Sequence, residues 1–360
     1  MKIPLYQGLL PFSLALGLAL ASIVTALSPA AGATELIIFT WEDYISTQVI
    51  KNFQAKTGIQ VRQVYFDSDQ TRDEIVASAR GKEFDLVVFD GVAVQIFGKN
   101  DRLLAINSSQ VPNFANIDQR WQESCGNFGV PYSYGTVGIL YDQNKFAAPP
   151  DSWQDLLQPA PAHHGHLAMI EDMTDILTPA LLYLGYNINS EKEDQLKAAY
   201  SLLQQQVPAV LNYKYGLTNL KADDRQSELH LALGYSGDQH AMNETSPGGN
   251  WAYVIPREGT AVWVDCLAVT AWSSRKESAL AFLDYLSDPE VAAKNAEEIH
   301  SIPTVTKARQ HMSPEAAADP ALFPNLDTLN NVQMYRILSD SNLRLRRRIL
   351  DTLIKRHEAQ

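Results

Sequence analysis

The sequence predicts an α/β protein built on a parallel β-sheet. Short segments rich in apolar and β-branched residues alternate along the chain with longer segments whose apolar residues recur at helical spacing. The length of 360 residues suits two domains, and the 46% of hydrophobic residues is enough to fill buried cores. The composition therefore excludes a disordered or fibrous chain.

The N-terminal segment has the pattern of a secretory signal peptide. Lys2 precedes an apolar run over 9–27, and the small residues Ala31 and Ala33 follow it. We expect cleavage after Ala33, so that residues 1–33 are a signal peptide and the mature protein is exported and soluble. The alternative is an uncleaved membrane anchor, because the apolar run is about long enough to cross a bilayer.

Three predicted strands and two predicted helices open the mature chain in the order typical of a parallel sheet. The predicted strands cover 35–40, 59–66 and 84–89, and the predicted helices cover 44–57 and 71–80. Ligands bind such sheets beyond the carboxyl ends of the strands.

The middle of the chain repeats this pattern. Further strands are predicted over 167–170, 230–234, 252–255 and 261–264, and further helices over 176–184 and 190–206. Pro256 and Gly259 mark a turn between two of these strands, and the chain is mainly helical from Glu277. No long linker separates two halves, which favours domains joined by more than one crossing of the chain.

Charge and motifs exclude several classes of function. The formal net charge of −12 is opposite to that of a typical nucleic-acid-binding protein, so no nucleic-acid partner is expected. The sequence contains no nucleophile elbow, phosphate-binding glycine loop or zinc-protease motif. We therefore expect no enzyme, no cofactor and no catalytic residue. An exported hydrolase that uses its carboxylates as an acid–base pair is the alternative.

Three clustered histidines and two cysteines are further candidate site residues. His163, His164 and His166 stand in a Pro-rich loop, but a metal site needs three or four ligands in fixed geometry, so we expect a solvated loop and no metal. Cys125 and Cys266 can form a disulfide in an oxidising compartment. Two buried free thiols are the favoured expectation, because nothing in the sequence brings the two cysteines together.

Aromatic and acidic residues gather where the predicted strands end. The set is Trp41, Glu42, Tyr44, Asp90, Asp172, Asp175, Tyr235, Trp263 and Asp265. Aromatic faces attract ammonium groups, and carboxylates bind them by charge-assisted hydrogen bonds, which is the combination that a linear polyamine requires. The alternative is structural, because a Trp beside a strand often packs in a core and an Asp after a strand often caps a helix.

Several short motifs carry a family resemblance. They are Phe39-Thr-Trp-Glu-Asp-Tyr44, Phe53-Gln-Ala-Lys-Thr-Gly58, Phe84-Asp-Leu-Val-Val88, Val130-Pro-Tyr-Ser-Tyr-Gly135, Trp153-Gln-Asp-Leu156, Leu182-Tyr-Leu-Gly-Tyr186, Val262-Trp-Val-Asp265, Ala281-Phe-Leu-Asp-Tyr-Leu286 and Leu322-Phe-Pro324. Through them the chain resembles the periplasmic spermidine/putrescine-binding proteins of bacterial ABC importers, over essentially the whole mature chain.

The resemblance implies two α/β lobes with a ligand cleft between them and a hinge that closes it. The chain is then expected to cross between the lobes within 134–141, near Ala261 and near Pro303. The first lobe would comprise 34–141 and 262–303, and the second lobe 142–261 and 304–360.

The resemblance also implies roles for individual residues. Trp41 and Tyr44 would line the cleft, the pair Asp172 and Asp175 would meet one amine, and Tyr235 stands where the family has a Trp. Trp263 would stack on the ligand, and Asp265 would be the main ammonium-binding carboxylate.

The sequence also departs from the family pattern. Asp90-Gly-Val92 stands where the family has Ser-x-Tyr, and the family's Tyr is missing near 299–303. Asp90 and Glu42 add acids, so the expected ligand is still a cation. Another organic cation, such as an amino-acid derivative, an opine-like compound or thiamine, is the alternative to putrescine or spermidine.

The expected partners follow from the same resemblance. It implies a monomeric periplasmic protein that delivers its ligand to an ABC permease in the inner membrane. The sequence leaves open the alternative that the protein passes its ligand signal to a receptor instead.

Overall fold

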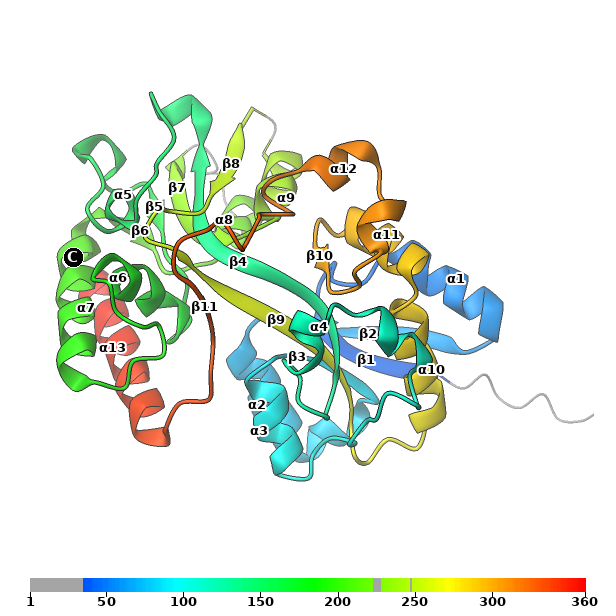
Figure 1. Ribbon diagram of the computed structural model, residues 1–360. Coiled ribbons are helices and arrows are strands. Elements are labelled where there is room, and N and C mark those ends of the chain that lie inside the picture. The colour runs from blue at the N-terminus through cyan, green and yellow to red at the C-terminus, as the bar shows by residue number, and fades with distance from the viewer. Residues whose placement is uncertain (1–34, 223–227, 247) are drawn as a thin grey trace, which may run out of the picture. The chain divides into compact units, whose positions relative to one another are not determined.

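The computed structural model describes residues 35–222, 228–246 and 248–360 (Figure 1). The predicted signal peptide, residues 1–33, lies outside these described residues. Within the three described ranges, no helix combines the length and the apolar character needed to pass through a bilayer.

Strands and helices alternate along most of the chain. The strands are β1 Glu35–Trp41, β2 Gln60–Phe66, β3 Leu86–Asp90, β4 Val130–Asp142, β5 Leu167–Ala168, β6 Val210–Asn212, β7 Leu231–Tyr235, β8 Trp251–Val254, β9 Thr260–Val269, β10 Ile302–Pro303 and β11 Val332–Met334. The helices are α1 Thr47–Thr57, α2 Asp69–Ala77, α3 Ala93–Lys99, α4 Gln119–Gln122, α5 Trp153–Leu157, α6 Thr178–Tyr183, α7 Glu193–Gln206, α8 Gly216–Ala222, α9 Asp238–Thr245, α10 Lys276–Leu286, α11 Pro289–Glu298, α12 Pro314–Ala318 and α13 Asp340–Glu358.

The strands pair in the order β2-β1-β3-β9-β4-β7-β5-β6. β1 pairs in parallel with both β2 and β3, which confirms the predicted parallel opening of the chain. β5 also pairs in parallel with β6 and β7. The antiparallel strands β9 and β4 stand in the middle of this order.

The long strands β4 and β9 connect two sets of secondary-structure elements (Figure 1). Residues Val130–Thr136 of β4 pair with β9, whereas Val137–Tyr141 pair with β7 on the other side of the order. β9 likewise pairs with β3 through Asp265–Val269 and with β4 through Val262–Leu267. Each of these two strands therefore contributes side chains to both sets of elements.

Buried apolar residues form two main cores. The first core packs β1, β3, α1 and α10 and includes Phe39, Phe53 and Phe282. The second core packs β7, α6, α7 and α13, and α7 lies beside α13 (Figure 1). Leu231 and Leu233 of β7 face this second core, while Ala232 between them faces a smaller cluster on the opposite side of the sheet.

The C-terminal part of the chain contributes to both cores. Val305, Ala308 and Met312 pack into the first core. Ile349 and Leu350 of α13 pack into the second core. Phe323 and Val332 also pack against the first core, and Tyr335 packs against the second, so the chain passes from the first core to the second after Val332.

Capping residues explain where the predicted helices begin. α1 begins at Thr47, three residues later than the predicted start, because the Ser46 side chain accepts a hydrogen bond from the Val49 N–H. It ends at Gly58, whose φ of 73° is the left-handed conformation that glycine adopts without strain. α2 begins at Asp69 because Ser68 accepts a hydrogen bond from the Thr71 N–H.

The residue pattern did not predict the full length of β4 and β9. Pro131, Gly135 and Gly138 interrupt the apolar pattern of β4, so periodicity alone did not predict this 13-residue strand. The predicted strand over 261–264 is the first half of the ten-residue β9, which continues past the polar Asp265.

The expectation of two free thiols is wrong, because Cys125 and Cys266 form a disulfide. Cys266 is buried in β9, and Cys125 is buried in the segment between α4 and β4. Because β9 and β4 are neighbours in the sheet, the segment that leads into β4 places Cys125 next to Cys266 of β9. This proximity depends on the sheet order, which spacing in the sequence does not reveal.

The histidine loop is packed against its neighbours rather than fully solvated. The His163 ring stacks on Phe146 with centroids 4.2 Å apart, and His166 stacks on His230 at 4.0 Å. Within the described residues, no group of three or more His, Cys, Asp and Glu side chains is arranged to hold a metal ion.

Candidate functional site

β9 supplies the central residues of the candidate site. Trp263 and Asp265 are two positions apart and share one face of the strand, while the intervening Val264 is buried on the other face. Across the sheet, Asp265 stands opposite Asp90 of β3 and Ser133 of β4. Trp263 stands opposite Gly135 of β4.

Tyr44 binds Asp265 from the segment after β1. The Tyr44 hydroxyl donates a 2.5 Å hydrogen bond to Asp265 Oδ2. The backbone turns at Asp43, which has a φ of 56°, and Tyr132 of β4 donates a 2.8 Å hydrogen bond to the Tyr44 carbonyl oxygen. Asn295 donates to the Tyr132 hydroxyl in turn, at 2.6 Å. Two further segments, β4 and α11, therefore help to hold Tyr44 beside Asp265.

Burial makes the Asp265 carboxyl unusually basic. The pKa of Asp265 is raised to about 7, chiefly by desolvation. The hydrogen bond from Tyr44 and the charge of Arg72 lower this pKa, and the charge of Asp90 raises it. Burial also raises the pKa of Tyr44 well above its ordinary value, so this phenol is a hydrogen-bond donor at neutral pH. A ligand cation at this position would favour the ionised form of Asp265.

A second carboxylate is held by two phenols. The Tyr235 hydroxyl donates a 2.5 Å hydrogen bond to Asp175 Oδ2, and the Tyr335 hydroxyl donates to Asp175 Oδ1. The pKa of Asp175 is raised to about 7, because desolvation and the charge of Asp172 outweigh the two phenol hydrogen bonds, which lower it. Tyr235 ends β7, whereas Tyr335 follows β11.

Asp172 has a local structural role beside Asp175. Its Oδ1 accepts hydrogen bonds of 2.7 Å from the N–H groups of Thr174 and Asp175. It thereby forms an Asx turn immediately before the short helical turn Asp175–Leu177, which leads into α6. Asp172 therefore has a local structural role, and its charge also acts on Asp175.

Trp263 lies between the two carboxylate groups in the network of contacts: it shares a strand face with Asp265 and contacts Tyr235, which binds Asp175. Its ring meets Tyr235 edge-on, with centroids 6.1 Å apart and an interplanar angle of 87°. Its Nε1 is buried, and no described residue accepts a hydrogen bond from it. Gly135 makes room for the indole, because a Cβ at that position would lie 2.3 Å from Trp263 Cζ2. The backbone of β4 therefore determines how deep this ring lies.

The remaining predicted residues have separate environments. The Trp41 ring packs edge-on against Phe66 with centroids 4.5 Å apart, at the margin of the first core. Glu42 is exposed in the turn after β1. Asp90 forms an ion pair with Arg72, with Arg72 Nη2 lying 3.1 Å from Asp90 Oδ2.

The structure also brings forward residues that sequence reasoning missed. They are Tyr335, Arg72 and Asp69. The charges of Arg72, Asp90, Asp172 and Asp265 act on Asp69, and those of Asp175 and Asp172 act on Tyr335. No motif marked them. Asp69 and Arg72 lie in a segment that reads as an ordinary helix, and Tyr335 lies after a three-residue strand.

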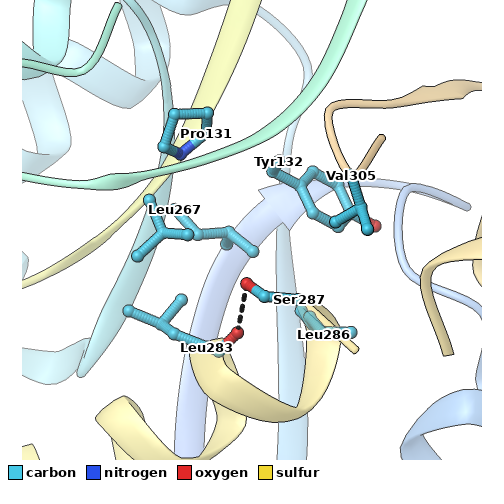
Figure 2. A pocket seen from close by; sticks show the side chains of 8 residues that line it. Pro131, Tyr132, Leu267, Leu283, Leu286, Ser287 and Val305 are labelled. Carbon is cyan, nitrogen blue, oxygen red and sulfur yellow. Dashed lines mark hydrogen bonds between the residues drawn. The ribbon is translucent and has the colours of Figure 1, made fainter. Parts of the chain in front are cut away.

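The small enclosed cavity in the first core is not part of this site. Figure 2 shows Pro131, Tyr132, Leu267, Leu283, Leu286 and Val305 around it, with the Ser287 hydroxyl donating to the Leu283 carbonyl oxygen. Its volume of about 10 Å³ is the size of one water molecule. It is a packing defect between β4, β9 and α10.

The comparisons with known proteins agree with this geometry. Residues 48–324 match the family of bacterial extracellular solute-binding proteins. The chain belongs to this family. It is 34% identical over 330 residues to a norspermidine sensor of Vibrio cholerae, covering 92% of this chain and 91% of that protein. It is 28% identical over 303 residues to the spermidine/putrescine-binding periplasmic protein of Escherichia coli, covering 82% of this chain and 85% of that protein.

Solved structures of solute-binding proteins share the fold. A protein of Listeria monocytogenes assigned to a spermidine/putrescine ABC transporter superposes with a TM-score of 0.79 at 26% identity, covering 89% of this chain and 98% of that chain. This confirms the predicted two-lobed α/β fold of the family. The first core and the second core are the interiors of its two lobes.

Proposed function

We propose that this protein is a periplasmic binding component for a polyamine, putrescine or spermidine, and that it delivers the ligand to an ABC permease. The observation that carries the proposal is the pairing of Asp265 with Tyr44 beside the Trp263 ring. It offers one carboxylate to an ammonium group and one aromatic surface to the adjoining methylenes. The names of the relatives support the same class of ligand.

The two carboxylate groups divide the ligand between them. One terminal ammonium binds Asp265, and a second ammonium binds Asp175 with Asp172 behind it. Trp263 and Tyr235 cover the methylenes between these ends, and Trp41 and Glu42 stand at the entrance. Only a closed arrangement of the two lobes makes both sets of contacts, so the ligand favours closure. No bond is made or broken, and the protein acts as a carrier rather than an enzyme.

The location and organisation belong to the same proposal. Residues 1–33 are removed by cleavage after Ala33, and the mature protein is a periplasmic monomer. The first lobe comprises 34–141 and 262–303 with the segment through Val332 added, because Val305, Met312 and Val332 pack against the first core. The second lobe comprises 142–261 and the remaining C-terminal segment.

Sensing is the second candidate function. The identity to the norspermidine sensor, 34%, exceeds that to the spermidine/putrescine-binding protein of Escherichia coli, 28%, and covers more of the chain. A sensor and a carrier bind the ligand in the same way and differ in the partner that reads the closed form. Deletion of the gene separates them: loss of labelled polyamine uptake supports the carrier, and normal uptake with an altered response to added polyamine supports the sensor.

The test of ligand class is a calorimetric titration. Protein isolated from the periplasm is unfolded and refolded to remove bound ligand, and then titrated with putrescine, spermidine, norspermidine, arginine and thiamine. We expect tight binding of a polyamine that Asp265→Asn weakens by at least about 30-fold, because one partner of a buried charge pair is lost. Asp151→Asn is the matched control, since Asp151 pairs with Arg257 at an exposed position. A folded wild-type protein that binds arginine or thiamine but no polyamine would refute the proposed ligand class.

A further inference from the structure

Asp90 and Asp265 are direct neighbours across two strands. The register of β3 against β9 places Asp90 opposite Asp265. Two like charges in directly opposed positions repel each other and destabilise the pair. The site at this end therefore contains two carboxylates where a single ammonium group needs one, and the surroundings of Asp90 decide which of the two is available.

The Asp90 side chain is 37% exposed, and both of its carboxylate oxygens accept hydrogen bonds. Its Oδ1 accepts hydrogen bonds from the N–H groups of Val92 and Ala93, at 2.9 and 2.8 Å. Its Oδ2 accepts a hydrogen bond from Arg72 Nη2 at 3.1 Å. Both oxygens of Asp90 are thus turned toward the start of α3 and toward α2.

Arg72 is a fixed internal cation. Its side chain is 1% exposed, and its guanidinium lies over the Phe89 ring at 4.9 Å from the centroid. Besides Asp90 it binds Asp69 and Asp73, so three carboxylates surround one guanidinium. A buried guanidinium held by several charged partners and an aromatic face has little freedom to move.

We propose that Arg72 is a positioning residue that holds Asp90 out of the ligand site, so that Asp265 is the carboxylate that receives the ammonium group at this end. The inference rests on the proposed function and deepens it. It assigns Asp90, which the sequence suggested as an additional ligand-binding acid, to the Arg72 network instead. This end of the site then accepts one ammonium group, which matches the single ammonium group at the end of a linear amine.

The charges around Asp265 give this inference a specific readout. Tyr44 and Tyr132 face Asp265 from the segment after β1 and from β4, Asp90 faces it from β3, and Asp69 and Arg72 face it from α2. Among them Asp90 raises the pKa of Asp265 and Arg72 lowers it. Removing Asp90 must therefore shift the ionisation of Asp265 to lower pH, and removing Arg72 must shift it to higher pH.

The experiment measures spermidine affinity of the wild type, Asp90→Asn and Arg72→Met between about pH 5 and about pH 9. At the alkaline end, we expect the spermidine affinity of Asp90→Asn to lie within about fivefold of the wild-type affinity. As the pH falls, Asp90→Asn should lose its affinity at a lower pH than the wild type does. We expect Arg72→Met to lose affinity at higher pH than the wild type. A purely structural role would not move the two profiles in opposite directions.

Matched variants keep the test decisive. Glu74→Gln removes an exposed carboxylate of the same helix, which accepts a hydrogen bond from Gln70, so its profile should coincide with that of the wild type. Arg72→Lys keeps the positive charge, so the pH at which it loses half of its spermidine affinity should equal that of the wild type. This variant also serves if Arg72→Met folds poorly. Should Asp90→Asn lose about 30-fold or more at every pH, Asp90 would be a direct ligand and the inference wrong. A wild-type protein that binds no polyamine would instead remove the proposed function itself.

Discussion

The hydroxyl of Tyr44 and the carboxylate of Asp265 are joined by a 2.5 Å hydrogen bond between residues 221 positions apart. The bond links the segment after β1 to the middle of β9, and Tyr132 and Asn295 support it from β4 and α11. A carboxylate held in this way keeps its orientation before the ligand arrives. The site is thus preorganised, which reduces the entropy that binding must offset.

Replacing Tyr44 by Phe should weaken polyamine binding about tenfold at neutral pH. The variant removes a hydrogen bond to a charged group, and such bonds contribute about 1.5 kcal/mol or more. It also removes an interaction that lowers the pKa of Asp265, so less of the carboxylate is ionised at neutral pH. Calorimetric titration checks this. Tyr285→Phe is the control, because Tyr285 donates to the Val49 carbonyl oxygen away from the site; equal affinities of both variants would contradict the assignment.

Polyamine binding should release protons near neutral pH. Burial raises the pKa of both Asp265 and Asp175 to about 7, so each carboxyl is about half protonated at that pH without ligand. An ammonium group requires the ionised form, so we expect about one proton to be released for each polyamine bound. Titration at pH 7 in two buffers of different ionisation enthalpy measures this number. Asp175→Asn should halve it, and a buffer-independent heat in the wild type would contradict it.

The same shifts predict how stability depends on pH. A carboxyl whose folded pKa lies above its unfolded value stabilises the folded state at acid pH, and this contribution is lost as the pH rises through the folded value. We therefore expect the Tm of the ligand-free protein to fall between about pH 4 and about pH 7 through Asp265 and Asp175. Saturating polyamine should reverse the trend. Thermal unfolding of the wild type against Asp265→Asn isolates the share of one group, and parallel Tm profiles for the two proteins would contradict the assignment.

Gly135→Ala should damage the site while leaving the fold intact. A Cβ at Gly135 would lie 2.3 Å from Trp263 Cζ2 and 2.8 Å from Ser236 Oγ, so the indole must move. We expect a loss of affinity of about tenfold or more, measured by titration. Gly216→Ala is the matched control, because its Cβ would meet Ala232 at an ordinary contact distance of 3.4 Å. Unchanged affinity of Gly135→Ala would mean that Trp263 does not contact the ligand.

The sequence allowed the fold class and part of the site to be predicted because those signals are local. β1, β2 and β3 carry alternating or apolar patterns, and Trp263 and Asp265 share a strand face by simple alternation. Family motifs pointed to Tyr44 and Asp265, whose hydrogen bond no local pattern could predict.

Other features depend on the register of distant strands. Tyr335 reaches Asp175 only because β11 pairs in parallel with β9 and returns the chain to the second core. Arg72 binds Asp90 because α2 packs beside the end of β3. Neither residue stands in a distinctive motif, and both act through partners more than 15 positions away.

The disulfide between Cys125 and Cys266 should stabilise the protein without taking part in binding. It closes a loop of 141 residues, and a native disulfide in an exported domain contributes about 2–5 kcal/mol to the free energy of unfolding. Cys266 neighbours Asp265 on β9 but is buried on the opposite face of the strand. We expect the double variant Cys125→Ser with Cys266→Ser to unfold at lower denaturant concentration and to bind polyamine within about threefold of the wild type. Reduction of the wild type by a thiol should reproduce the loss of stability, and should leave the double variant unaffected. A large loss of affinity in a folded double variant would show that the disulfide positions Asp265 as well as stabilising the first core.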